Sequence, residues 1–199
     1  MVTIRDRGRL PHWETAQACY FVTFGLADSL PKSVLRQIEL ERVDIVRTAE
    51  AMKRELSAAE QRRLIELTGV RIEEYLDAGA GSCFLVEPAL AGKIVHALRH
   101  FEGVRYRLFA WCVMPNHVHV VFQPLMDHTL AGIVHGWKSY TAKEANRLLQ
   151  RTGVFWQREY YDHLVRDAPD LRRVVRYVLE NPEKAGLRNW PWLSAALTH

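Results

Sequence analysis

The chain has 199 residues, of which 48% are hydrophobic and 25% are charged, a balance typical of a soluble globular protein and unlike that of a disordered one. No apolar run approaches the roughly 18 to 20 residues that cross a bilayer, and residues 1–7 lack the apolar stretch of a signal peptide. Cys19, Cys83 and Cys112 are odd in number and widely separated, which excludes a disulfide framework and a CxxC zinc site. We therefore expect one cytoplasmic domain over residues 1–199.

The net charge of +4 permits a polyanionic partner without requiring one. Between residues 130 and 190 there are eleven basic and seven acidic side chains, so this part of the chain carries a surplus equal to that of the whole protein. Solvated helix faces produce such a surplus in many proteins, and charge alone is therefore weak support for nucleic-acid binding.

The first half of the chain predicts one strand followed by helices. Residues 18–24 are aromatic and β-branched up to Gly25, which favours a buried strand. Two helices should follow as an insertion over residues about 28–80, because strand patterns lie on either side of it. The second helix begins at the capping-box spacing of Ser57 and Glu60 and runs to about Asp77.

The second half predicts strands and helices in alternation. A helix starts at Pro88, strands cover residues 106–113 and 117–122, a helix runs from about 129 to 150, and a last strand lies within 155–165. A final helix has an apolar stripe and should stop at Asn181-Pro182, because proline disfavours helix in the residue before it. This order predicts an α+β fold with a mostly antiparallel sheet.

His117 and His119 are the clearest candidates for chemistry. Residues two apart on a strand point to the same face, about 7 Å apart along the chain, so both imidazoles can reach one ion. Neutral imidazole binds zinc, iron and manganese, and two nitrogens leave positions open for a carboxylate or amide, water and a substrate oxygen. A chain with nine histidines has such a pair by chance often enough that the spacing alone does not decide.

Four sequence blocks give the histidine pair a context. They are WCVMPNHVHVVF at 111–122, WKSYTAKEAN at 137–146, FWQREYYD at 155–162 and RYVLENPEKAGL at 176–187. In this order the blocks closely resemble the REP-associated tyrosine transposases, relatives of the single-tyrosine HUH transposases of bacterial insertion sequences. The resemblance covers most of the chain outside the helical insertion.

The resemblance implies a fold, an activity and partners. The fold is a ferredoxin-like antiparallel sheet, which we expect to have its helices on one side and the histidine pair on a central strand. The activity is that of a metal-dependent DNA strand transferase and endonuclease. A divalent metal, Mg²⁺ or Mn²⁺, polarises the scissile phosphate, and a helical tyrosine attacks it to leave a 5′-phosphotyrosine link and a free 3′-hydroxyl. The expected partner is single-stranded DNA with hairpin, REP-like elements, and the expected location is the nucleoid.

Gly136 is a possible break in the helix predicted over residues 129–150. Tyr140 is the candidate nucleophile, because it opens the helix that then follows the histidine strand. Glu144, one turn later on the same helix face, is the candidate third metal ligand beside His117 and His119, with Asn146 in reserve.

Alternatives to this assignment stay open. If the helix is unbroken, Tyr140 shares a face with Ile133 and Trp137 and is a core residue instead. Tyr160 and Tyr161 are then the other candidates for the nucleophile.

Basic side chains in the same blocks are candidates for contact with DNA phosphates, and several lie off the apolar stripe of the final helix. They are Lys138, Arg158, Arg172, Arg173 and Arg176. Assembly of two chains is left open. So are two other functions: a domesticated relative that binds DNA hairpins without cleaving them, and an unrelated metal hydrolase.

Overall fold

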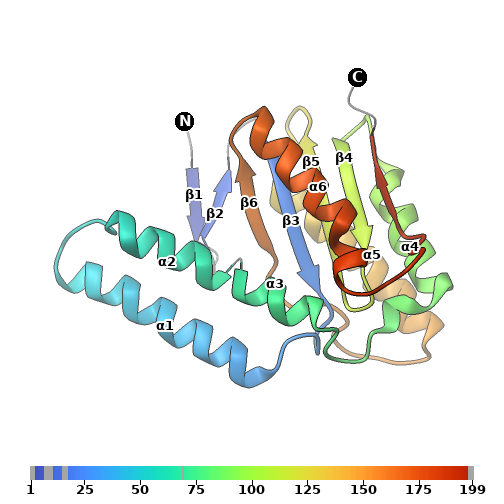
Figure 1. The fold of residues 1–199 in the computed structure, drawn as a ribbon, viewed down its shortest axis with the longest axis horizontal. Helices are drawn as coiled ribbons and strands as arrows, with labels where there is room; N and C mark the ends of the chain where they lie inside the picture. Colours follow the sequence, from blue (N-terminus) through green and yellow to red (C-terminus); the bar gives the residue numbers. More distant parts are fainter. Residues whose placement is uncertain (1–2, 7–10, 15–17, 69, 197–199) are drawn as a thin grey trace.

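The computed structural model describes residues 3–6, 11–14, 18–68 and 70–196. Its centre is a five-stranded antiparallel sheet in the order β6-β3-β5-β4-β7 (Figure 1). The strands are β3 (Cys19–Gly25), β4 (Tyr106–Val113), β5 (His117–Pro124), β6 (Tyr161–Val165) and β7 (Leu193–Ala195). Strands β6, β3, β5 and β4 lie in the order of a ferredoxin-like sheet. The predicted α+β fold with an antiparallel sheet is therefore confirmed. We did not predict β7, or the hairpin of β1 (Thr3–Asp6) and β2 (Pro11–Glu14).

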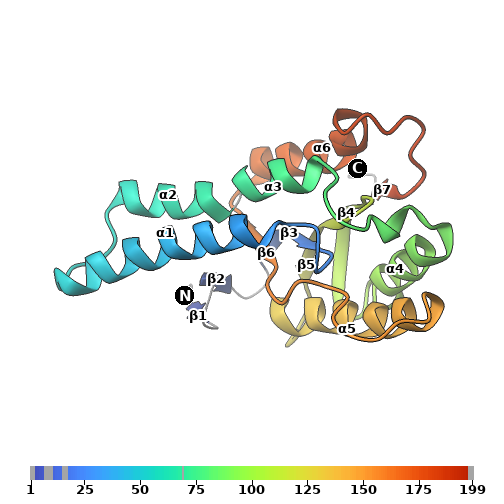
Figure 2. The ribbon, with the colours of Figure 1, turned by 90° about the horizontal axis from the view of Figure 1, so that it is seen from below.

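The sheet is covered by helices on both faces, whereas we expected helices on one side. Helices α4 (Pro88–His100) and α5 (Leu130–Leu148) cover one face, and α6 (Ala168–Lys184) covers the other (Figure 2). Val118, Val120 and Phe122 face α4 and α5 in the larger core. Val121, on the opposite face of the same strand, packs with Val174 and Val178 of α6. Because the side chains of a strand alternate between faces and both faces carry apolar residues here, both need cover.

The insertion forms a helical arm between β3 and α4. It consists of α1 (Lys32–Ala51), α2 (Ala58–Thr68) and α3 (Val70–Asp77), followed by the short 3₁₀ turn η1 (Phe84–Val86). The predicted capping box is present: the Ser57 backbone N–H donates to Glu60 Oε2 (2.8 Å), and the Glu60 N–H donates to Ser57 Oγ (3.3 Å). The arm has its own small core, and α3 brings its end beside α6 (Figure 2).

Helix α6 runs past the end that we predicted at Asn181-Pro182 and stops at Lys184. Pro182 has no N–H to donate to the carbonyl one turn earlier, so the last turn of α6 has one hydrogen bond fewer, yet the helix continues for two more residues. The helix ends in a Schellman motif, in which the N–H groups of Gly186 and Leu187 donate to the carbonyls of Glu183 (2.9 Å) and Pro182 (2.8 Å), with Gly186 at φ 77°. Asn181 and Lys184 therefore lie on the same continuous helix as Tyr177.

Among the described residues, no helix is both long and apolar enough to cross a membrane.

Candidate active site

The two histidines of β5 lie side by side and are fully buried, with their Nε2 atoms 2.9 Å apart. Strand pairing places His119 opposite Thr23 of β3 and Cys112 of β4, at the centre of the sheet. Both rings point to the face covered by α6, where His119 stacks on Phe21. The predicted common direction of the pair is therefore present.

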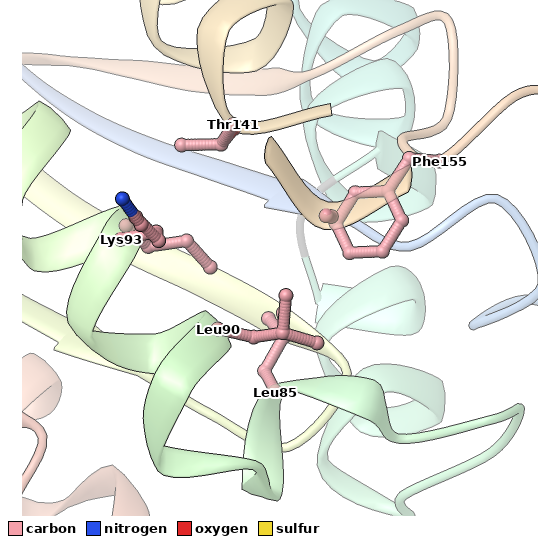
Figure 3. Close-up of a pocket in the computed structure, with 7 residues that line it drawn as sticks. Leu85, Leu90, Lys93, Thr141 and Phe155 are labelled. Atoms are coloured by element: carbon pink, nitrogen blue, oxygen red, sulfur yellow. The ribbon is translucent and has the colours of Figure 1, made fainter. Parts of the chain in front are cut away.

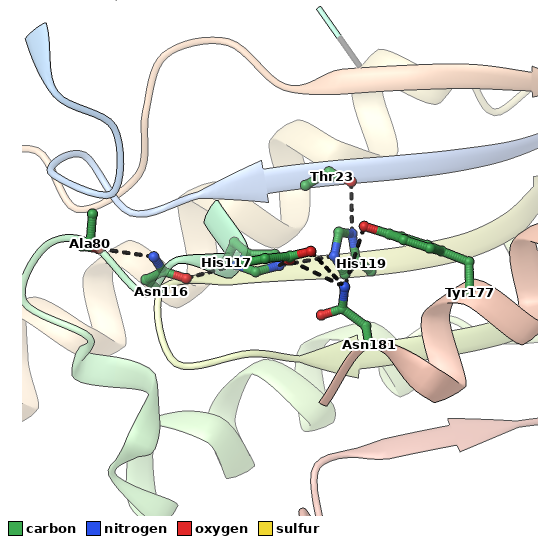
Figure 4. A network of polar contacts seen from close by, with 8 residues as sticks. Thr23, Ala80, Asn116, His117, His119, Tyr177 and Asn181 are labelled. Carbon is green, nitrogen blue, oxygen red and sulfur yellow. Dashed lines mark hydrogen bonds and ion pairs between the residues drawn. The ribbon is translucent and has the colours of Figure 1, made fainter. Parts of the chain in front are cut away.

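Hydrogen bonds fix both rings through their Nδ1 atoms (Figure 4). Asn116 Nδ2 donates to the Ala80 carbonyl (2.9 Å), so the amide oxygen of Asn116 faces His117. That oxygen can only accept, and His117 Nδ1, 2.7 Å away, must therefore donate its proton and leave Nε2 with a lone pair. His119 Nδ1 is bonded to the Thr23 hydroxyl at 2.8 Å. Such partners orient metal-binding imidazoles in many proteins.

Burial keeps both imidazoles neutral. It lowers the pKa of His119 from 6.5 to about 3, and it lowers the pKa of His117 well below its ordinary value, with a further contribution from the neighbouring His119. The pair therefore offers nitrogen lone pairs at neutral pH.

Asp77, the last residue of α3, completes a cluster of three ligand atoms that lie within 4.8 Å of one another. Its Oδ1 lies 3.6 Å from His117 Nε2, and because His117 is neutral this contact is not an ion pair. Burial raises the pKa of Asp77, while the hydrogen bond from Asn181 and the charge of Lys184 oppose that rise.

This donor set fits a divalent metal ion. Two nitrogens that bind one ion at right angles, each roughly 2.1 Å from it, are about 3 Å apart. The Nε2 atoms are separated by 2.9 Å, and a carboxylate faces them. The two imidazole nitrogens and the carboxylate are ligands that zinc, iron and manganese accept.

Tyr177 and Asn181, one turn apart on α6, lie beside the histidine pair on the α6 side (Figure 4). The Tyr177 ring meets the His119 ring edge to face, with centroids 5.5 Å apart. Asn181 Nδ2 lies 3.3 Å from the Tyr177 hydroxyl and donates to Asp77 Oδ1 (3.2 Å) and Oδ2 (3.3 Å). Within the described chain, the buried Asn181 Oδ1 has no hydrogen-bond partner. A tyrosine, a side-chain amide and the three-ligand cluster thus meet in one place.

The structure does not bring the predicted Tyr140 and Glu144 to the histidines. Both lie on α5, which packs against the Val118 and Val120 face of the sheet. The Tyr140 side chain is 40% exposed beside His96, and Glu144 pairs with Lys93 and Arg147, each at 3.0 Å. The reserve ligand, Asn146, is also on α5 and donates to the Gly153 carbonyl (2.9 Å). The position of α5 therefore removes all three from the cluster.

The two other candidate tyrosines are held in packing roles. Tyr160 belongs to the larger core on the α5 side, where the Lys138 ammonium lies over its ring. Tyr161 packs against the core of the arm, and burial raises its pKa. Tyr177, by contrast, contacts the His119 ring directly.

The five predicted phosphate contacts are spread over both sides of the sheet. Arg172 and Arg176 are exposed on α6, and Arg173 on the same helix is bonded to Asp170 (2.6 Å). Arg158 is exposed in the connection to β6. The Lys138 ammonium donates to the carbonyls of Arg158 (2.9 Å) and Glu159 (3.3 Å), so it ties that connection to α5.

A narrow crevice lies between α4 and α5, lined by Leu85, Leu90, Lys93, Thr141 and Phe155 among others (Figure 3). It has no room for a water molecule, so the α5 side of the sheet offers no ligand site there. The cluster of metal-type ligands found among the described residues lies on the α6 side.

Comparison with known proteins agrees with this geometry. Residues 93–181, which hold the histidine pair, Tyr177 and Asn181, match the family described as "Transposase IS200 like". A curated protein of Haemophilus influenzae, named "Putative REP-associated tyrosine transposase", is 29% identical over 47% of this chain and 61% of its own length. The matched part thus spans less than two thirds of that relative.

A solved structure has the same fold. It is described as "Structure of the REP associates tyrosine transposase bound to a REP hairpin", with a TM-score of 0.52, 16% identity and coverage of 92% of this chain and 79% of that one. The chain is therefore similar to the IS200-like transposases over residues 93–181, and the resemblance to REP-associated tyrosine transposases that its sequence predicts is confirmed.

Proposed function

We propose that this chain is a metal-dependent enzyme that nicks and rejoins single-stranded DNA near hairpins, with Tyr177 as its nucleophile. The observation that carries the proposal is the contact of Tyr177 with His119 above a buried cluster of metal-type ligands. Similarity to the family alone would leave the choice of tyrosine open. This contact favours Tyr177 over Tyr140, Tyr160 and Tyr161.

His117, His119 and Asp77 would hold the ion, with Asn181 as a further oxygen ligand. A half-turn of the Asn181 amide would exchange its unpartnered Oδ1 with Nδ2 and direct an oxygen at the cluster. A bound Mg²⁺ or Mn²⁺ would polarise the scissile phosphate and offset its charge. Asn116 and Thr23 hold the imidazoles in the orientation that this role needs.

The proposed step exchanges one phosphoester for another. The Tyr177 phenol oxygen forms a bond to phosphorus, and the bond from phosphorus to the 3′-oxygen breaks. The phenol loses its proton and the leaving 3′-oxygen gains one, so the products are a 5′-phosphotyrosine and a free 3′-hydroxyl. Because the tyrosine ester keeps the energy of the phosphodiester, the reverse step can rejoin a strand.

The proposed DNA partner follows from the relatives and from charge. The solved relative is described as bound to a REP hairpin. Arg172 and Arg176 extend from the exposed side of α6, the helix that carries Tyr177, where they can reach phosphates near the site. Assembly of two chains stays a prediction.

A covalent trapping experiment tests the proposal. REP-hairpin oligonucleotides labelled on the 5′ or the 3′ side of the cut are incubated with the protein and Mn²⁺, then denatured. Label on the 3′ side should migrate with the protein, while label on the 5′ side should be released with a 3′-hydroxyl. Peptide mapping of the adduct should find Tyr177.

The outcomes separate the functions. An adduct on Tyr140, Tyr160 or Tyr161 would overturn the choice of nucleophile. Tight hairpin binding without any adduct, across several metals, would support a protein that binds hairpins and does not cleave them.

A further inference from the structure

The last residue of α6, Lys184, places a positive charge beside the candidate nucleophile. It lies two helical turns after Tyr177, and its Nζ is 5.5 Å from the centroid of the Tyr177 ring. Its charge also acts on Asp77, across the cluster. The Lys184 side chain is 56% exposed, so the ammonium can meet a ligand without moving through the core.

Lys184 supplies positive charge that the other side chains around the site do not supply. The imidazoles are neutral, and Asp77 and Glu180 are acidic. The last carbonyls of a helix are also negative, which is unfavourable for an anion at this end of α6. A phosphodiester that enters beside Tyr177 therefore needs positive charge from the protein as well as from an ion.

Lys184 is held by an exposed ion pair with Glu180. Its Nζ lies 3.0 Å from Glu180 Oε2, one turn earlier on the exposed side of α6. Exposed ion pairs of this type contribute little to stability, so the ammonium can exchange Glu180 for another anion at small cost. The three N–H donors of an ammonium suit phosphate oxygens, which carry more charge as the phosphoryl group is transferred.

We propose that Lys184 binds the phosphate group beside Tyr177 and contributes to both the affinity for DNA and the reaction at that phosphate. The inference rests on the proposed function, because it takes single-stranded DNA as the ligand of this face. It adds to that function a specific contact between Lys184 and the charge of one phosphate.

Binding to a series of oligonucleotides tests the contact without any metal or cleavage. Each REP-hairpin oligonucleotide has one phosphate replaced by a methylphosphonate, which is neutral, and affinities are measured in EDTA. One position should weaken binding by wild-type protein roughly three- to tenfold. Lys184→Met should bind unmodified DNA with the same loss of affinity, and the methylphosphonate at that position should cause no further loss. Lys184→Arg should restore most of the affinity and most of the effect of that methylphosphonate.

Lys93→Met is the matched control, because Lys93 is a lysine paired with a glutamate on the opposite side of the sheet. It should bind every oligonucleotide as wild type does. If Lys184→Met keeps the wild-type pattern of sensitivity, or if Lys93→Met loses as much affinity, the inference is wrong. The melting temperature of each variant excludes unfolding as the cause.

The trapping experiment keeps this inference separate from the proposed function. If wild-type protein forms the adduct and the phosphate that depends on Lys184 is not the one that is cut, the inference fails alone. If no adduct forms and one phosphate still depends on Lys184, cleavage fails while the phosphate contact stands.

Discussion

The two faces of β5 differ in what they contain. On one face, Val118, Val120 and Phe122 pack against α5 in a core with few polar groups. On the other, His117 and His119 meet Asp77 of the arm and Tyr177 of α6 in a buried polar cluster. Alternation along a single strand therefore separates the residues that stabilise the fold from those that can perform chemistry.

This difference also explains how the polar face is tolerated. Buried polar groups are costly unless they are hydrogen-bonded. The Nδ1 atoms of both histidines have partners, and their Nε2 atoms lie 2.9 Å from each other. The apolar face supplies the rigidity that keeps this arrangement in register, so changes on the two faces should have separable effects.

The largest expected effect distinguishes the tyrosines of the two faces. Tyr177→Phe keeps the ring against His119 and removes the nucleophilic oxygen, so covalent adduct and nicking should fall about a thousandfold or more. Tyr140→Phe removes an exposed hydroxyl on α5 and should nick as wild type does. Both variants should melt within a few degrees of wild type. Full activity in Tyr177→Phe would show that the nucleophile is not the tyrosine on the histidine face.

Substitutions of acidic residues on the two faces should differ in their effect on the metal affinity of the protein. Asp77→Asn removes the carboxylate charge of the cluster, and we expect Mn²⁺ affinity to fall by about 10- to 100-fold. Glu144→Gln changes a residue bound to Lys93 and Arg147, so Mn²⁺ affinity should not change. Isothermal titration of each protein gives the affinity directly. Weaker binding in Glu144→Gln would restore the ligand predicted from the sequence.

The sequence contains enough information to predict some of this site. The spacing of His117 and His119 on a strand is sufficient to give both a common direction. The apolar alternates Val118 and Val120 carry a further signal, because they mark the face that a helix must cover. Helix α5 connects two parallel strands, β5 and β6, and such crossover helices pack on the sheet with a fixed hand. A helix over the valines does not bring Tyr140 to the histidines of the same chain.

Other parts of the site could not be predicted in this way. Asp77 lies in the inserted arm, and helical periodicity shows which side of α3 is apolar without showing where the arm docks. Tyr177 lies beside the apolar stripe of α6, where packing and catalysis give the same pattern. Only the tertiary contact with His119 distinguishes the two roles.

The acid stability of the metal-free protein should depend on the histidine face. The folded-state pKa of His119, about 3, lies below its ordinary 6.5, so the unfolded chain binds a proton more readily between these values. The free energy of unfolding should therefore fall as pH drops from 6.5 toward 3, by up to about 1.4 kcal/mol per pH unit for each buried histidine. It should recover as pH rises back to 6.5 and stay constant above that value.

Two variants assign that pH dependence. In urea titrations, His119→Gln should have a shallower pH dependence than wild type, because one neutral buried imidazole is gone. His135→Gln changes an exposed histidine of α5 and should follow the wild-type curve. Identical curves for all three proteins would show that the histidine pair is not held neutral by burial.

The smallest expected effect concerns the arginines of the two sides and shows where DNA lies. Each phosphate contact that is lost should reduce the slope of log K against log salt by roughly 0.7 on single-stranded DNA. We expect this for Arg172→Gln and Arg176→Gln, which are exposed on the tyrosine helix. Arg147→Gln is the matched control, because this exposed arginine pairs with Glu144 on the opposite side. Lys138→Met should also keep the wild-type slope, since its ammonium is already bonded to backbone carbonyls.

Fluorescence anisotropy with one hairpin oligonucleotide at several salt concentrations gives all the slopes. A reduced slope in Arg147→Gln with no change in Arg172→Gln would place the DNA on the α5 side, away from Tyr177.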